Sequence, residues 1–325
     1  MGNDLQPSSV ILVLESAKRS NDGIKAFCDR SRLAPLQVSP GHLMEVLRSD
    51  MDLGGILCGE DYAGTLAETT ALALRIHEER PELPIFLRRD QRCGLDDIPK
   101  AQRYVFCAAW VESNVESLDA VLGEYLVSLV YPGALVRGIS EISRVALASQ
   151  LPGLAMECRA PCIVRDGLIF GELFSLIPLE SRWCRGYMML QADESPLLDL
   201  IARRNGKGEA SFREVASLLS ETTNLIWGAF KNRFIGDAGA GPGQHIQVPL
   251  LINHHLKYIS FGTENPQLCF LYTLRDTVSG ASMKLYQRFI FNLNWSPEGF
   301  RELAHEVDDP VARGELELFD IYEGN

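Results

Sequence analysis

Five polar or small residues follow one face of a predicted helix in SLLSETTNLIWGAFKNRF, residues 217–234: Ser217, Glu221, Asn224, Gly228 and Lys231. At about 100° per residue these positions fall within roughly 80° of one another. The opposite face is apolar and consists of Val215, Leu218, Leu219, Leu225, Ile226, Ala229 and Phe230. An amide can hold a water molecule, because its oxygen accepts a hydrogen bond while its nitrogen donates one. These five residues, called the polar stripe below, are therefore either an ordinary solvated face or a site that acts on a partner.

The composition of the chain limits the classes of protein to which it can belong. Its 325 residues are 46% hydrophobic and 23% charged, as in a soluble globular protein of two domains. The net charge of -12 argues against a nucleic-acid partner or an anionic membrane partner. The start MGNDLQPSS lacks the features of a signal peptide, and no run reaches the ~18 apolar residues that span a bilayer. We therefore expect a cytoplasmic protein without membrane insertion.

The cysteines, histidines and glycine-rich loop of the chain give weaker signals. Eight cysteines are scattered, and the one close pair, in CRAPC at 158–162, has no second ligand pair for zinc, so we interpret them as small buried hydrophobes. His254 and His255 would point to opposite faces of a strand, which excludes a helical ligand pair. GDAGAGPGQ at 236–244 lacks the lysine of a phosphate-binding loop and is interpreted as a linker.

Short apolar runs alternate with helical stretches over the first part of the chain. Five predicted strands lie at VILVLES, LQVS, LGGILCG, LPIFLRR and RYVFCAAW, and helical patterns lie between them and after the last, through residue 130. Strands that alternate with helices predict a doubly wound, five-stranded parallel sheet with right-handed crossovers, which is a flavodoxin-like α/β fold.

The length and strand order of residues 8–131 resemble the receiver domain of bacterial response regulators, in pattern and not in motif. A receiver phosphorylates an aspartate at the end of its third strand and holds magnesium with an acidic pair after its first strand. Its acid pair, phosphoacceptor, hydroxyl and lysine are replaced here by Glu15-Ser16, Cys58 or Gly59, Arg88 or Arg89, and Cys107-Ala108. We expect a degenerate receiver-like domain that cannot accept phosphate and that is either a structural or dimerisation module or a partner-recruiting one.

A Pro-Gly break at Pro132-Gly133 predicts a domain boundary. After it come a helix at 134–151, strand-like runs to residue 192, a further helix, the helix with the polar stripe, and three more strand-like runs. These three strand-like runs begin with QVPLLIN, QLCFLYT and LYQRFIF. This order predicts an α+β domain over 134–294, with long helices packed on a mostly antiparallel sheet. The acidic segment 295–325 is predicted to be a short helical tail.

The polar stripe resembles a family signature. Ser217-x-x-x-Glu221-x-x-Asn224, followed by Pro249 in an apolar strand, is similar to the motif of the CheC/CheX/FliY phosphatases of bacterial chemotaxis, and the resemblance covers about residues 134–294. The interval from Asn224 to Pro249 is longer than in the family. The first long helix reads Glu141-Ile-Ser-Arg144, so a second Glu-x-x-Asn is absent, which makes the chain more like CheX than CheC.

The resemblance implies a function and a role for each residue of the stripe. These phosphatases hydrolyse the aspartyl phosphate of CheY, the response regulator of the flagellar motor. By that likeness Asn224 orients the attacking water, Glu221 docks on the lysine of the receiver, and Ser217, Gly228 and Lys231 contact the partner. Magnesium would arrive on the phosphorylated receiver, so no cofactor is expected on this chain. A homodimer is expected by the same analogy.

Two other functions are compatible with the sequence. The chain could be a non-catalytic signalling adaptor that binds a receiver or a motor component through the same helix. It could also regulate itself, with residues 8–131 covering the polar stripe until a partner binds.

Overall fold

A computed structural model of the chain describes its two large sheets and most of the helices around them. The described residues are 9–16, 22–31, 33–38, 41–49, 53–91, 93–111, 122, 125–126, 130–164, 168–204, 206, 209–236, 249–253, 258–260, 266–291 and 300–303. Most of the helix expected before residue 131, His254 and His255, nearly all of the glycine-rich linker and the tail beyond 303 lie outside these ranges. None of the described helices is both long enough and apolar enough to cross a membrane.

The N-terminal part (residues 9–126) contains the predicted five-stranded parallel sheet. Its strands are β1 (Ser9–Leu14), β2 (Leu33–Gln37), β3 (Leu53–Gly59), β4 (Ile85–Arg89) and β5 (Phe106–Val111), in the order β2-β1-β3-β4-β5. Between them lie α1 (Asp22–Arg30), α2 (Leu43–Arg48), α3 (Leu66–Glu79) and a 3-10 turn, η1 (Arg103–Val105). This doubly wound arrangement confirms the predicted α/β class.

Both faces of this sheet are covered, which explains its uninterrupted apolar strands. Leu12 and Leu14 of β1 pack with α2 and α3 on one face, while Ile11 and Val13 pack with α1 on the other. Every residue of β3 and β4 is buried. A parallel sheet between two helical layers has no solvent-facing side, so its inner strands do not alternate between polar and apolar residues.

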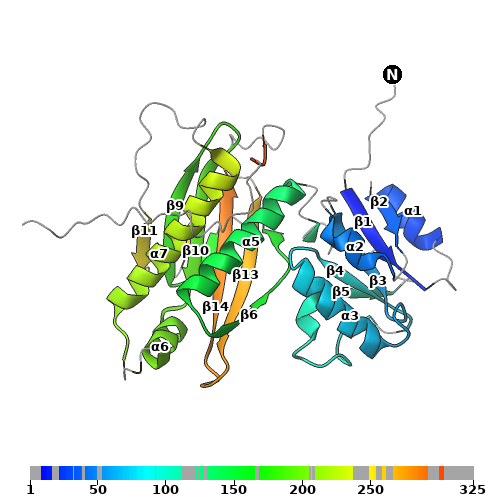
Figure 1. Ribbon diagram of the computed structural model, residues 1–325, viewed down its shortest axis with the longest axis horizontal. Helices are drawn as coiled ribbons and strands as arrows, with labels where there is room; N and C mark the ends of the chain where they lie inside the picture. Colours follow the sequence, from blue (N-terminus) through cyan, green and yellow to red (C-terminus); the bar gives the residue numbers. More distant parts are fainter. Residues whose placement is uncertain are drawn as a thin grey trace, which may run out of the picture.

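The C-terminal part (residues 130–303) is an antiparallel sheet with helices over one face (Figure 1). Its strands follow the order β11-β9-β10-β14-β13-β6, and β7 also pairs with β13. Their bounds are β6 (Leu154–Cys158), β7 (Cys162–Val164), β9 (Leu173–Glu180), β10 (Arg185–Ala192), β11 (Leu250–Asn253), β13 (Gln267–Asp276) and β14 (Ser282–Phe291). A separate two-stranded antiparallel sheet pairs β8 (Leu168–Phe170) with β12 (Tyr258–Ser260).

Three α-helices lie on the C-terminal sheet: α5 (Gly133–Gln150), α6 (Glu194–Arg204) and α7 (Phe212–Phe230), the last continuing as a short π-helix, η4 (Lys231–Ile235). Met188 and Leu190 of β10 pack into the core beneath these helices, whereas Met189 packs on the opposite face with Ile169 of β8. This alternation confirms the predicted α+β class, with the long helices α5 and α7 side by side (Figure 1).

His77 of α3 joins the two parts of the chain. Its Nε2 lies 2.6 Å from the carbonyl oxygen of Cys158 at the end of β6, and its ring packs edge-on against Tyr104 with 5.5 Å between centroids. Burial lowers the pKa of His77 below its usual 6.5, and Arg144 lowers it further; the Cys158 carbonyl and Glu78 oppose this shift without cancelling it. The ring is therefore neutral at pH 7 and donates from Nε2 to the carbonyl.

Candidate functional site

Helix α7 carries the polar stripe and begins at a capping box. The Ser211 side chain accepts a hydrogen bond from the Glu214 amide (3.3 Å), and the Glu214 carboxylate accepts one from the Ser211 amide (2.8 Å). This satisfies two amides that the first turn of a helix leaves without partners. The helix thus starts more than one turn before Ser217, so that the stripe stands on regular helix.

The opposite face of α7 is fixed to the core and to the sheet. Leu219, Ile226 and Phe230 are buried among the apolar residues of the C-terminal part. The Thr223 hydroxyl donates to the Leu219 carbonyl (2.7 Å), so the Ser175 hydroxyl of β9 donates to Thr223 in turn (2.7 Å). Buried hydrogen bonds of this kind have few alternatives. The helix therefore holds its outer face in one orientation.

The polar stripe lies where the sequence predicted it, on the outer face of α7. Ser217, Glu221 and Asn224 are exposed, and Gly228 and Lys231 are half-buried. Ser217 donates to a Glu221 carboxylate oxygen (2.7 Å), whereas the Asn224 carboxamide has no hydrogen bond to any described residue. A methyl group placed on Gly228 would meet no atom within 4 Å, so there is open space above this residue.

The C-terminal end of the stripe departs from the predicted regular helix. The α-helix ends at Phe230, and Lys231 is the first residue of η4, where the Gly236 amide donates to the Lys231 carbonyl (2.9 Å). A π-helix has a wider turn than an α-helix. Lys231 therefore lies at a junction and does not continue the angular spacing of Ser217, Glu221, Asn224 and Gly228.

The neighbouring helix α5 offers no second acid and amide pair. Glu141 accepts from Arg233 (2.6 Å), which also donates to Glu302 (2.8 Å). Burial lowers the pKa of Arg233, but these two carboxylates raise it by more, so the side chain stays charged. Arg144 occupies the position of the amide. Among the described helices, α7 alone has a Glu-x-x-Asn facing solvent.

The N-terminal part does not cover the polar stripe. In Figure 1, α5 lies between α7 and the N-terminal part, and the contacts of His77 are to the far strand, β6. Ser217, Glu221 and Asn224 are exposed in the full chain. The described residues of the N-terminal part therefore do not occlude the stripe as hypothesised, because α7 packs on β9 and β11, at the opposite edge of the sheet from β6.

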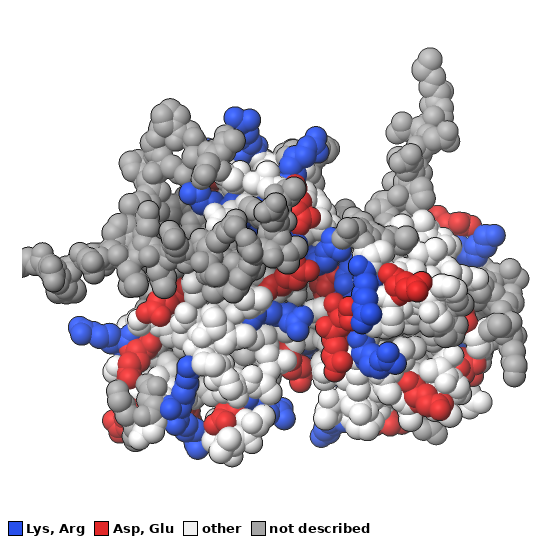
Figure 2. Space-filling view, viewed as in Figure 1, with Lys and Arg blue, Asp and Glu red and all other residues white. Residues whose placement is uncertain are grey.

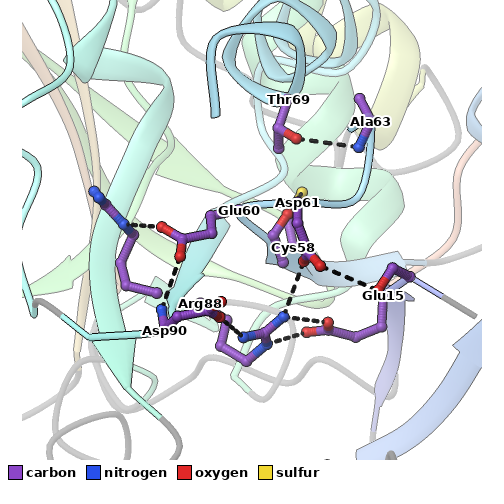
Figure 3. A network of polar contacts seen from close by, with 11 residues as sticks. Glu15, Cys58, Glu60, Asp61, Ala63, Thr69, Arg88 and Asp90 are labelled. Carbon is purple, nitrogen blue, oxygen red and sulfur yellow. Dashed lines mark hydrogen bonds and ion pairs between the residues drawn. The ribbon is translucent and has the colours of Figure 1, made fainter. Parts of the chain in front are cut away.

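A buried arginine pairs with Glu15, the carboxylate at the position where the sequence resemblance would put the acid pair of a receiver. Arg88, at the end of β4, is 2% exposed, and its Nε and Nη2 donate to the two oxygens of Glu15 at 2.6 Å each. Asp90 accepts from Nη1 at 2.8 Å and Asp61 from Nη2 at 3.3 Å; Figure 3 shows Glu15 and Asp61 turned toward the guanidinium. Burial lowers the pKa of Arg88, but Glu15 and Asp90 raise it by more, so it stays above its usual value.

The end of β3 has no room for a phosphoacceptor. A Cβ atom on Gly59 would lie 2.6 Å from a Glu15 oxygen and 2.8 Å from Arg88 Nη2. The preceding Cys58 is 1% exposed, and burial raises the pKa of its thiol to about 12. Both positions predicted to replace the acceptor are thus closed, one by the ion pair and the other by the core.

Sequence reasoning located the polar stripe but missed what supports it. The capping box is visible as Ser-x-x-Glu at 211–214, so this signal could have been found. The contact of Ser175 with Thr223 and the pairing of Glu15 with Arg88 join residues 48 and 73 positions apart, and no local pattern indicates either. Within the described part of the chain, no group of three or more possible metal ligands occurs.

Comparisons with solved structures align about half of this chain. No protein-family model matches the sequence, and no curated protein matches it. A putative chemotaxis protein from Desulfovibrio vulgaris Hildenborough has 15% sequence identity and a TM-score of 0.36, covering 49% of this chain and 97% of its own.

Two further solved structures give similar values. The chemotaxis protein CheX from Desulfovibrio desulfuricans has 11% identity and a TM-score of 0.36, covering 49% of this chain and 99% of its own. The CheX-CheY-BeF3-Mg²⁺ complex from Borrelia burgdorferi has 16% identity and a TM-score of 0.34, covering 49% and 97%. About half of the chain thus aligns with nearly the full length of CheX-like chemotaxis proteins.

Proposed function

We propose that this protein is a phosphatase that hydrolyses the aspartyl phosphate of a separate receiver protein of the CheY type. The observation that carries the proposal is the Asn224 carboxamide, which is exposed and has no described partner on a helix that its other face holds in place. The acid Glu221 stands one turn away, and the space above Gly228 is open to a docking partner.

The chemistry asks little of the phosphatase, because an aspartyl phosphate is already activated. The oxygen of a water attacks phosphorus, the bond from phosphorus to the aspartate oxygen breaks, and inorganic phosphate and a free carboxylate result. The receiver supplies its own magnesium and lysine around the phosphoryl group. Asn224 accepts a hydrogen bond from the water and keeps it in line with phosphorus, the positioning role that glutamine has in GTPases.

Glu221 aligns the two proteins. We assign it to the lysine of the receiver, a contact that the Ser217 hydroxyl prepares by holding one carboxylate oxygen and leaving the other for the partner. Because residues three apart share a helix face, Glu221 and Asn224 meet the receiver together. Gly228 allows the partner backbone to come close, and Lys231 adds a cation at the edge of the contact.

A phosphatase assay tests the proposal. Full-length protein is mixed with a CheY-type receiver phosphorylated by acetyl phosphate in the presence of magnesium, and the lifetime of the phosphate is followed. We expect the native chain to shorten this lifetime, and Asn224→Ala to lose about 100-fold of the rate at saturating protein, since a misplaced water costs about that much. The matched control is Asn232→Ala, an exposed amide on η4, the π-helix that continues α7, which should retain the rate.

An unchanged phosphate lifetime with the native chain would reject the enzyme. So would equal rates for the native chain and Asn224→Ala. Glu221→Gln should raise the protein concentration needed for half-maximal rate without the large loss at saturation.

A second candidate function is a non-catalytic adaptor, and the closed receiver-like site favours it. The Arg88–Glu15 pair and the crowding at Gly59 support the inference that the N-terminal part is a receiver-like fold that neither binds magnesium nor accepts phosphate. An adaptor would bind the phosphorylated receiver equally well with Asn224 or with alanine at this position, and neither form would hydrolyse the phosphate. Light scattering of the native chain would show at the same time whether it is the homodimer that the family analogy suggests.

A further inference from the structure

A cavity of about 570 Å³ lies between the two parts of the chain, away from the polar stripe. The N-terminal part contributes Lys100, Arg103 and Tyr104 from the connection into β5, and the C-terminal part contributes Arg159, after β6, and Tyr286 and Arg288 of β14. Its volume is in the range of small-molecule sites, which often lie between domains.

The charge of this interpart cavity is opposite to that of the whole protein. Among its described lining residues four are Lys or Arg and one, Glu157, is an acid, although the chain has a net charge of -12. On the face shown in Figure 2, by contrast, basic and acidic side chains are interspersed. Arg103 is ion-paired with Asp96 (3.3 Å), whereas Lys100, Arg159 and Arg288 have no carboxylate partner among the described residues, so an anion in the cavity gains mainly from these three.

Three of these cations have hydrogen-bonding capacity to spare. Lys100 and Arg159 are exposed and make no side-chain hydrogen bond or ion pair to a described residue. Arg288 Nη1 donates to Gln267 (3.2 Å), while its Nε is buried without any described partner. Arg103 differs, because its Nε donates to the Ile98 carbonyl (2.6 Å), which holds the loop before β5 in place.

Arg288, which lines the cavity, is the sharpest indication of a ligand, because its Nε is shielded from solvent and has no described hydrogen-bond partner. Buried polar groups in proteins nearly always have hydrogen-bond partners, and a charged donor without one is costly. Arginine presents its donors in a planar fork that matches the oxygens of a phosphate or a carboxylate. An oxyanion that draws the guanidinium toward the cavity would supply the missing acceptor.

The half-buried rings of Tyr104 and Tyr286 supply the second element of recognition. Aromatic rings offer large apolar faces and edges on which a planar ring can pack, with the phenol left to hydrogen-bond. A cation cluster beside two such rings suits a ligand with an anionic group at one end and a planar ring at the other.

We propose that the interpart cavity binds a small organic phosphate with a planar ring, the chemistry of a nucleoside monophosphate. The phosphate pairs with Arg288 and Arg159, Lys100 completes its neutralisation from the other part of the chain, and the base packs against the tyrosine rings. A ligand so placed touches both parts of the protein at once. The site is separate from Asn224 and does not depend on the phosphatase activity.

Direct binding to the full-length protein tests the site. The four common ribonucleoside monophosphates are titrated by calorimetry at low salt, with the matching nucleosides and inorganic phosphate as separate arms. We expect at least one monophosphate to bind, and to bind at least tenfold more tightly than its nucleoside and than inorganic phosphate. Its affinity should fall as salt is raised, because the contact is largely ionic.

Variants locate the site. Arg159→Gln and Arg288→Gln should each weaken the monophosphate at least tenfold, whereas Arg185→Gln, an exposed arginine on β10 outside the cavity, should leave binding unchanged. Arg159 and Lys100 are exposed, so their variants retain the fold and keep the test valid if Arg288→Gln is unstable.

Three results would overturn the proposal. The first is that none of the four monophosphates binds at about 1 mM. The second is that a nucleoside or inorganic phosphate binds as tightly as the monophosphate. Equal binding of the nucleoside would mean that the phosphate is not recognised, and equal binding of inorganic phosphate would mean that the ring is not recognised. The third is native affinity in both Arg159→Gln and Lys100→Gln. Since binding is measured without a receiver, failure here leaves the phosphatase proposal intact.

Discussion

Replacing Arg88 with methionine should destabilise the N-terminal part severely. The substitution keeps most of the apolar volume but removes a guanidinium that donates two 2.6 Å hydrogen bonds to Glu15. The side chains of Glu15 and Arg88 are each 2% exposed, so water cannot replace the lost partner. The variant would leave a buried carboxylate without its cation.

The expected cost follows from this burial. Removing one member of a buried ion pair typically costs about 3–5 kcal/mol, which is a large share of the ~5–15 kcal/mol stability of a domain. Asp61 and Asp90, whose side chains are 36% and 37% exposed, remain solvated when Arg88 is replaced, so they add little to the loss of stability. The double variant Arg88→Met, Glu15→Gln removes the uncompensated charge and should recover at least about 2 kcal/mol of the loss.

Hydrogen exchange in native buffer measures this loss part by part. Amides of β1, β3 and β4 should lose protection in Arg88→Met, while those of β9, β10 and β14 keep it, and urea unfolding gives the total. Arg48→Met is the matched control, because it breaks an ion pair with Glu79 at a similar distance (2.8 Å) on the surface of the same part. That control should leave protection unchanged.

Equal protection in Arg88→Met and Arg48→Met would refute the reasoning. It would mean that the guanidinium cluster is solvated or that the core adjusts around Glu15. A double variant less stable than Arg88→Met would equally contradict it, because the uncompensated charge would then not be the source of the loss.

Three further predictions concern pH, phosphate and helix packing. Because burial holds the pKa of His77 below its usual 6.5, its neutral form contributes stability that is complete above about pH 6.5 and is lost as the pH falls; urea unfolding at pH 8 and pH 5 should show this loss in the native chain and a smaller one in His77→Gln. Acetyl phosphate should label neither the native N-terminal part nor Gly59→Asp, since the new carboxylate collides with the Arg88 cluster; mass spectrometry of the peptide detects any label. Gly138→Ala should lower the free energy of unfolding by about 1–3 kcal/mol, because its Cβ would lie 2.4 Å from a Phe234 ring carbon. Gly228→Ala, which has open space around it, should raise the free energy of unfolding by about 0.5–1 kcal/mol and yet weaken binding of the receiver; thermal unfolding measures both variants.

The predictions from sequence succeeded where the signal is local. Apolar runs that alternate with helical patterns predicted the parallel sheet, and the structure has it in the order β2-β1-β3-β4-β5. The 3.6-residue period likewise placed Glu221 and Asn224 on the outer face of a helix. A helix that buries one face needs apolar residues every three or four positions, and a strand that buries both faces needs an unbroken apolar run. Both patterns lie within a few residues of sequence, so they predict the element directly.

The partners of the charged side chains were decided by tertiary structure alone. The sequence by itself predicted charged residues at the ends of β1 and β4, but not that Glu15 and Arg88, 73 positions apart, neutralise each other. Nor could it show that Lys100, Arg159 and Arg288 surround one cavity, or that α5 separates α7 from the N-terminal part. The order of the strands in the sheets brings these residues together although they lie far apart in the sequence. An ion pair between two such residues produces no repeating pattern along the chain, so the sequence does not indicate which charged residues will pair.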